Sequence, residues 1–224
     1  MTARQYMIES TCRQEGLCEA FGGNMKRIIS ILLLLILTFT MVTSCSKFGS
    51  RQYVLDVLDA MDKGDDERFY ELLEDKSYDI NRNPNLFIDR FIFWGMSISS
   101  PIEKACSLSR YDYVEALIKR GADINRRYNL GALYTSVTFM KTDIVKLLLE
   151  NGADPSIGAS YPLIAAARWW NFNSVESYKI MKLLIEYGAD KSFKDRQFGY
   201  RNAYEVALYF EAPQEFLDLL KPDE

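Results

Sequence analysis

The stretch that decides the fold covers residues 100–125 and reads S-P-I-E-K-A-C-S-L-S-R-Y-D-Y-V-E-A-L-I-K-R-G-A-D-I-N. A similar stretch begins at residue 131 and reads G-A-L-Y-T-S-V-T-F-M-K-T-D-I-V-K-L-L-L-E-N-G-A-D-P-S. Pro101 and Gly121 lie 20 positions apart in the first copy, as do Ala132 and Gly152 in the second. A spacing that recurs in this way indicates an internal repeat, and such a repeat decides the fold.

Each copy reads as two short helices joined by a turn. Ser100 is suited to be the N-cap of the first helix, because its hydroxyl can accept a hydrogen bond from a free backbone N–H. Val114, Leu117 and Ile118 are three and four positions apart, so they share one face of the second helix. Gly121 supplies the left-handed residue that ends this helix. One such helix pair has too small an apolar face to be stable alone, so we expect the copies to stack.

The repeat resembles the ankyrin repeat, whose unit has about 33 residues and a T-P-L-H-x-A start. Here the start motif stands at residues 100–105 and 161–166, and the G-A-D triplet typical of the family begins at Gly121, Gly152 and Gly188. The resemblance implies an all-α ankyrin-repeat solenoid of about five helix-turn-helix repeats with finger loops, covering residues 52–224.

One position departs from the family pattern, because the chain contains no histidine. The positions that match the histidine of the motif hold Glu103, Tyr134, Ile164 and Glu205. In the family this histidine forms hydrogen bonds within and between repeats. We therefore expect a somewhat lower stability per repeat and an unchanged fold.

The N-terminal part contains a hydrophobic run at residues 28–42, directly after Lys26 and Arg27. A short basic region followed by such a run is typical of a secretory signal. Residues 42–45, V-T-S-C, resemble the lipobox of bacterial lipoproteins, which implies cleavage before Cys45 and acylation of its sulfur. The sequence thus predicts a signal peptide at residues 25–44, opening at Met25, and a lipidated tether at residues 45–51.

Two points about this segment stay open. Residues 1–24 show no helical or strand pattern, so we interpret them as an unstructured or mis-assigned extension. A single N-terminal transmembrane anchor is the alternative to lipidation, although a run of 15 residues is shorter than the about 20 that a span needs. The predicted location is the bacterial cell envelope, with the domain lipid-anchored and facing the periplasm or the cell surface.

Three irregularities interrupt the repeats. Residues 84–99 form an apolar insertion that either packs on the helices or presents an aromatic surface. In the fourth repeat, Pro162 and Gly188 lie 26 positions apart, which predicts six extra residues between its helices, at 168–173. The first and last repeats have charged outer positions, as expected of capping repeats.

The residues offer little chemistry. The net charge is −4 and no basic block is present, which disfavours nucleic acid as a partner. Without histidine or a C-x-x-C pair, no metal site is predicted, and no catalytic motif or cofactor motif is found. We expect Cys106 to be a buried thiol.

The predicted function is therefore binding of an unidentified protein partner by a monomer, through the concave face and the finger loops that the resemblance implies. The candidate contact residues are Arg126, Arg127, Tyr128, Asn129, Tyr134, Trp169, Trp170, Lys194, Arg196, Phe198 and Tyr200. One alternative is an immunity protein that neutralises a toxin. A further alternative is a hydrolase with a carboxylate pair in the insertions, which is disfavoured because no insertion is long enough to build a polar pocket.

Overall fold

The computed structural model describes residues 49–82, 99–126, 130–156, 161–196, 199 and 201–222. Contacts group the chain into residues 1–48 and residues 49–224, and every described residue belongs to the second unit. The predicted extension, signal peptide and lipidation site at Cys45 lie outside the described residues, as does the insertion up to residue 98.

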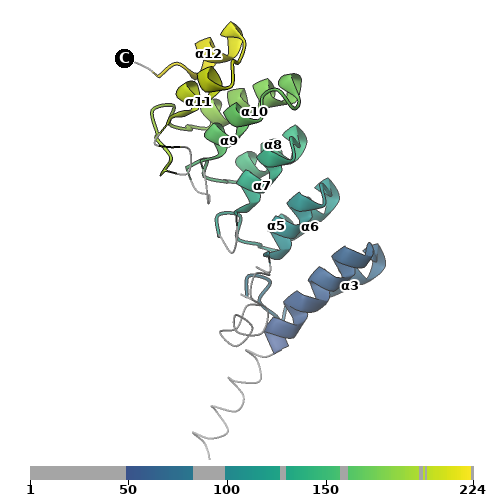
Figure 1. Ribbon diagram of the computed structural model, residues 1–224. Helices are drawn as coiled ribbons and strands as arrows, with labels where there is room; N and C mark the ends of the chain where they lie inside the picture. Colours follow the sequence, from purple (N-terminus) through teal and green to yellow (C-terminus); the bar gives the residue numbers. More distant parts are fainter. Residues whose placement is uncertain are drawn as a thin grey trace, which may run out of the picture. The chain divides into compact units, whose positions relative to one another are not determined.

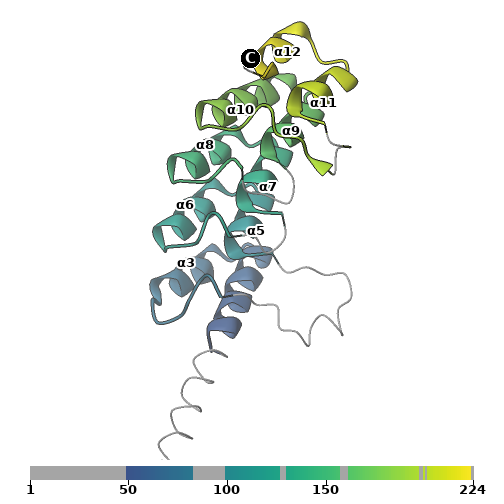
Figure 2. The ribbon, with the colours of Figure 1, turned by 90° about the vertical axis from the view of Figure 1, so that its left-hand side faces the viewer.

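The second unit is a stack of helix pairs arranged in two rows (Figures 1 and 2). The inner row consists of the helical residues 49–63, α5 (Pro101–Ser107), α7 (Ala132–Thr138), α9 (Pro162–Arg168) and α11 (Ala203–Tyr209). The outer row consists of α3 (Asp66–Glu74), α6 (Tyr111–Lys119), α8 (Thr142–Glu150), α10 (Ser174–Glu186) and α12 (Gln214–Leu220). Apart from an isolated bridge between Asp195 and Arg201, the described segments contain only helices, turns and bends. The predicted all-α repeat solenoid is confirmed.

The inner helices begin where the local sequence predicts. Ser100 accepts a hydrogen bond from the backbone N–H of Glu103, and the Glu103 carboxylate accepts one in return from the N–H of Ser100. This reciprocal arrangement is a capping box, and it satisfies donors that a helix start otherwise leaves free. Asn202 and Glu205 form the same arrangement at the start of α11.

The three G-A-D glycines end the outer helices in the predicted conformation. Gly121, Gly152 and Gly188 have φ angles of +91°, +88° and +90°. A Cβ atom at any of the three would meet no heavy atom within 4 Å. Glycine is therefore favoured there because of the backbone conformation and not because of lack of space.

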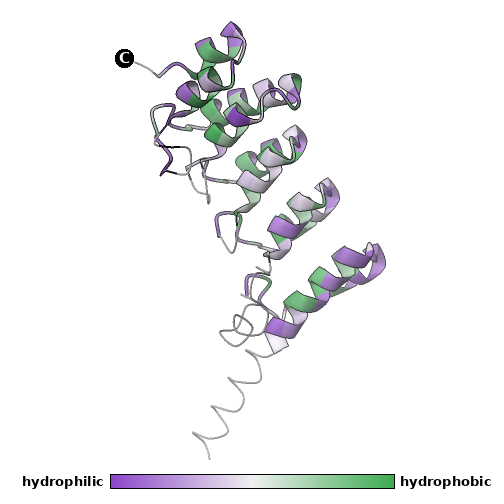
Figure 3. Cartoon of the chain, in the orientation of Figure 1, coloured by the Kyte–Doolittle hydropathy of each residue, from purple (hydrophilic) through white to green (hydrophobic). Residues whose placement is uncertain are grey.

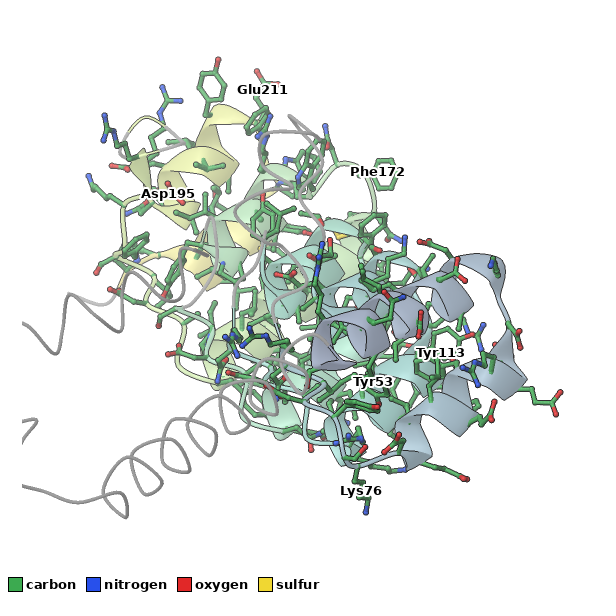
Figure 4. All side chains as sticks on the ribbon, turned by 90° about the horizontal axis from the view of Figure 1, so that it is seen from below. Tyr53, Lys76, Tyr113, Phe172, Asp195 and Glu211 are labelled. Carbon is green, nitrogen blue, oxygen red and sulfur yellow. The ribbon has the colours of Figure 1, made fainter. Side chains whose placement is uncertain are left out.

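The turns inside the first, second, third and fifth repeats share one geometry. Ser109, Met140 and Glu211 follow the C-caps of α5, α7 and α11, and their φ angles are 58°, 52° and 55°. Gly64 occupies the corresponding place in the first repeat with a φ of 66°. Figure 4 shows Phe172 and Glu211, which lie in the turns inside the fourth and fifth repeats, on one edge of the stack and Lys76 on the opposite edge.

A continuous apolar core runs between the two rows. Each outer helix after α3 buries two residues that are three positions apart, namely Val114 and Leu117, Val145 and Leu148, Met181 and Leu184, and Leu217 and Leu220. Figure 3 shows apolar residues in every helix pair of the stack, alternating with hydrophilic ones. Because each pair buries its apolar face against its neighbours, the stack is stabilised by the interfaces between the repeats.

An asparagine connects the first repeat to the second, and another connects the second repeat to the third. The side-chain amide of Asn125 donates to the carbonyl of Gly152 at 2.9 Å, and its oxygen accepts from the N–H of Asp154 at 2.8 Å. Asn81 makes the same two bonds with Gly121 and Asp123. Each asparagine therefore holds the turn of the following repeat through two hydrogen bonds.

The fourth repeat corrects one expectation. The predicted six-residue insertion at 168–173 does not lie wholly between the helices. The turn at residues 169–173 is two residues longer than the turn at 108–110, and α10 has 13 residues where α6 and α8 have nine. The remaining four inserted residues therefore add about one turn to the start of α10.

Candidate protein-binding surface

The structure describes six of the eleven candidate contact residues. Arg126, Lys194 and Arg196 are exposed, Trp169 is 40% exposed, and Tyr134 and Trp170 are half-buried. The other five lie outside the described residues, and they are Arg127, Tyr128, Asn129, Phe198 and Tyr200.

The two neighbouring tryptophans have different surroundings. The indole N–H of Trp170 donates to the carbonyl of Phe210 at 3.0 Å, and its ring lies 5.8 Å from the ring of Phe216. These contacts connect the fourth repeat to the fifth, so Trp170 has a structural role. The guanidinium of Arg168 lies over the exposed ring of Trp169, 5.0 Å from its centroid.

The last residues of the inner helices α5, α7, α9 and α11 form a row along the stack. The row consists of Ser107, Thr138, Arg168 and Tyr209, of which the first two are half-buried and the last two exposed. Tyr209 is 64% exposed, and the guanidinium of Arg201 lies 4.5 Å from its ring centroid. Two arginine–aromatic pairs therefore lie at the same edge of neighbouring inner helices. The candidates predicted from the sequence do not include Tyr209 and Arg201. Alignment of the inner helices by their starts could have indicated that Tyr209 lies beside Arg168.

The finger before α11 is held to the stack by its own contacts. The Asp195 carboxylate accepts a hydrogen bond from the backbone N–H of Tyr161 at 3.2 Å, and the ring of Phe193 stacks on Tyr161 at 4.4 Å. Lys194 forms an ion pair with Glu205 at 3.1 Å. The pKa of Glu205 is lowered by the backbone N–H of Asn202 and then by Lys194. These contacts hold the finger that carries Arg196 against the stack.

The described part of the chain places two carboxylates together between the first two repeats. Arg110 donates to Asp66 at 3.1 Å and to Asp112 at 2.6 Å, and the Tyr113 hydroxyl donates to Asp66. The pKa of Asp66 is lowered chiefly by the Tyr113 bond, and that of Asp112 chiefly by Arg110. A catalytic acid needs a raised pKa, so this pair is better explained as an ionic contact between repeats.

These lowered pKa values predict a stability that depends on pH. A carboxylate whose pKa is lower in the folded state stabilises that state above its unfolded pKa of about 3.9, and this contribution is lost as the pH falls through the folded pKa. We expect the double variant Asp66→Asn/Asp112→Asn to lose less stability than the wild type between pH 6 and pH 2, measured as the urea midpoint. Asp143→Asn, at an exposed position of α8, serves as the control. Equal acid sensitivity of the wild type and the double variant would contradict the assignment.

Cys106 is fully buried, as expected, and burial raises the pKa of its thiol to about 12. No group of histidine, cysteine and acidic residues in the described ranges could hold a metal ion. In the same ranges, no helix has both the length and the hydrophobicity that crossing a bilayer requires.

Comparison with known proteins agrees with this architecture. Residues 104–195 match the family model described as ankyrin repeats (three copies). The chain is also 33% identical over 104 residues to ankyrin repeat and SOCS box protein 11 of Homo sapiens and of Pongo abelii. That alignment covers 45% of this chain and 30% of the length of each relative. The chain therefore contains ankyrin repeats, which imply a surface for protein–protein interaction.

Proposed function

We propose that this protein is a lipid-anchored ankyrin-repeat protein of the bacterial cell envelope that holds a protein partner. The partner binds to the exposed side of the inner helices and to the finger loops. One observation carries the proposal, namely the two arginine–aromatic pairs Arg168–Trp169 and Arg201–Tyr209 on neighbouring inner helices. Arginine, tryptophan and tyrosine are the residue types enriched at interface hot spots.

The geometry of these pairs suits a protein surface. Tyr209 and Trp169 are 64% and 40% exposed, so a partner can bury a large apolar area on them. The guanidinium groups over the rings supply planar donors for carboxylates or carbonyls of the partner. Arg196 on the adjacent finger adds positive charge, which favours an acidic partner surface.

The binding proposal is tested with the tagged full-length chain and detergent extract of its own envelope. A protein retained by the wild type should be lost from the double variant Arg168→Ala/Tyr209→Ala. It should be retained by the control Lys146→Ala, which changes an exposed residue of the outer helix α8. Equal retention by both variants would place the contact elsewhere, and absence of any retained protein from the wild-type sample would contradict the proposal.

The anchor is tested separately by Cys45→Ala. We expect this variant to lose incorporation of labelled fatty acid and to move from the detergent phase to the aqueous phase, whereas the control Ser46→Ala should behave as wild type. A Cys45→Ala product that is still cleaved and still enters the detergent phase would contradict lipidation at this residue.

A further inference from the structure

The turn that follows α8 contains the one Asn-Gly pair of the sequence, Asn151–Gly152. Arg120 and Tyr187 occupy the position of Asn151 before the other two G-A-D triplets. Asparagine before glycine is a reactive pair, because the backbone nitrogen of the second residue can attack the side-chain amide carbon of the first and close a five-membered ring. Glycine has no side chain to hinder this nitrogen. The pair is therefore a candidate for spontaneous modification.

The structure places both reacting groups at the surface and holds each of them in a separate hydrogen bond. Asn151 is the C-cap of α8, and Asn151 and Gly152 are both exposed to water. The side-chain amide nitrogen of Asn151 donates to the carbonyl of Leu147 at 2.8 Å. The backbone N–H of Gly152 donates to the carbonyl of Leu149 at 3.1 Å. The attacking nitrogen and the leaving amide group are thus fixed on two different carbonyls of the helix.

The same turn is also held from the preceding repeat. The side-chain amide of Asn125 donates to the carbonyl of Gly152 at 2.9 Å, and its oxygen accepts from the N–H of Asp154 at 2.8 Å. These two bonds fix the peptide groups that follow the attacking nitrogen. Movement of Gly152 toward the amide carbon of Asn151 therefore requires the turn to open, with loss of bonds within α8 and between the repeats.

We propose that Asn151 is a deamidation site that the folded third repeat protects, so that it reacts in chains in which the turn after α8 has opened. A bond forms between the backbone nitrogen of Gly152 and the side-chain amide carbon of Asn151, and the bond from this carbon to the amide nitrogen breaks. Ammonia leaves with the proton of the Gly152 nitrogen, and a succinimide ring remains. Water, the only co-reactant, then opens the ring on either side and leaves aspartate or isoaspartate at residue 151.

Both products weaken the turn that protected the asparagine. Isoaspartate adds a methylene group to the main chain directly before Gly152, which shifts the turn relative to α8. Aspartate places a negative charge at the C-terminal end of α8, where the helix dipole disfavours it, and removes the donor to Leu147. A chain that has opened and reacted therefore opens again more readily. The site limits the lifetime of the third repeat.

The proposal is tested with the purified full-length chain, incubated at mildly alkaline pH. Peptide mapping by mass spectrometry follows the conversion of the amide of Asn151 into a carboxyl group. We expect fast deamidation in urea and slow deamidation of the folded chain. Because local opening and closing are fast compared with this chemistry, the rate in the folded chain follows the population of the open turn. Equal rates in the two conditions, or no deamidation at Asn151 in urea, would overturn the proposal.

Asn125→Ala and Asn81→Ala are a matched pair of variants. Asn125→Ala removes both bonds to the turn after α8 and should raise the deamidation rate of the folded chain about tenfold, as expected from the loss of two hydrogen bonds. Asn81→Ala removes the same two bonds from the turn after α6 and should leave the rate near that of the wild type. Circular dichroism checks that both variants keep their helices, and in urea all chains should react at one rate. Equal acceleration by both variants would overturn the control by this turn.

The effect of the product is tested separately by replacement of Asn151. Asn151→Asp reproduces one product, whereas Asn151→Gln keeps a neutral amide and would need a larger ring to react. We expect Asn151→Asp to unfold at a lower urea concentration than Asn151→Gln, and Asn151→Gln to stay unmodified. Equal urea midpoints of the two variants would overturn the effect on lifetime. These results are independent of the proposed lipid anchor and protein partner, because neither takes part in the reaction.

Discussion

Replacement of Glu103 by alanine is expected to lower the free energy of unfolding by about 3 to 5 kcal/mol. The variant loses two hydrogen bonds to the charged carboxylate, and it leaves two buried backbone N–H groups without that acceptor. Glu103 is only 2% exposed. One carboxylate oxygen accepts from the N–H of Ser100 at 2.9 Å, and the other accepts from the N–H of Gly131 at 2.7 Å. The first bond caps α5, and the second connects the second repeat to the third.

Glu205 offers a matched control. It occupies the corresponding position of α11 and forms a capping box with Asn202, but it is half-buried and its other bond is an ion pair with the exposed Lys194. We expect Glu205→Ala to cost about 1 kcal/mol, as is usual for the loss of a cap. Urea unfolding followed by circular dichroism measures both variants. If Glu103→Ala cost no more than Glu205→Ala, the bond to Gly131 would contribute nothing to stability.

The role of Glu103 also revises the expected consequence of the missing histidine. The resemblance implies that a histidine at this position forms hydrogen bonds within and between repeats. Glu103 forms both kinds of bond, within α5 and to Gly131. In this repeat the carboxylate replaces the histidine, so the expectation of a less stable repeat does not follow here.

The features that the sequence predicted well are those that depend on neighbours along the chain. The cap at Ser100 and the left-handed Gly121 follow from a few adjacent residues, because helix ends are determined locally. The recurrence of these local signals was enough to predict the stacked helix pairs. Burial of Cys106 followed in turn from the predicted repeat.

The features that the sequence missed depend on neighbours across the stack. The inter-repeat bonds of Asn125 become visible only when the following turn is in place. The extra turn of α10 could not be located, because a spacing gives the number of inserted residues and not the element that contains them. The position of Arg201 over Tyr209 requires a finger to return to its own helix, which no local pattern indicates.

Gly152→Val is expected to lower the free energy of unfolding by about 2 to 3 kcal/mol, because a β-branched residue strongly resists positive φ. This value lies in the upper part of the range for a strained backbone conformation. The φ angle of Gly152 is +88°. Space is available for the side chain, since a Cβ atom there would meet nothing within 4 Å. The strain therefore arises from the backbone alone.

Rotation of the backbone would not relieve this strain without loss of other bonds. The N–H of Gly152 donates to the carbonyl of Leu149 at 3.1 Å, and the carbonyl of Gly152 accepts from Asn125, so both ends of the residue are held. A matched comparison is Gly152→Ser with Gly64→Ser, measured by urea unfolding. Gly64 has a φ of 66°, and the corresponding place in the second repeat is occupied by Ser109 at 58°, so serine should be tolerated much better at 64 than at 152. Two results would contradict this account: an equal loss of unfolding free energy for serine at the two positions, or an unchanged melting temperature for Gly152→Val. Either would show that the positive φ angle is not the reason that the G-A-D glycines stabilise the fold.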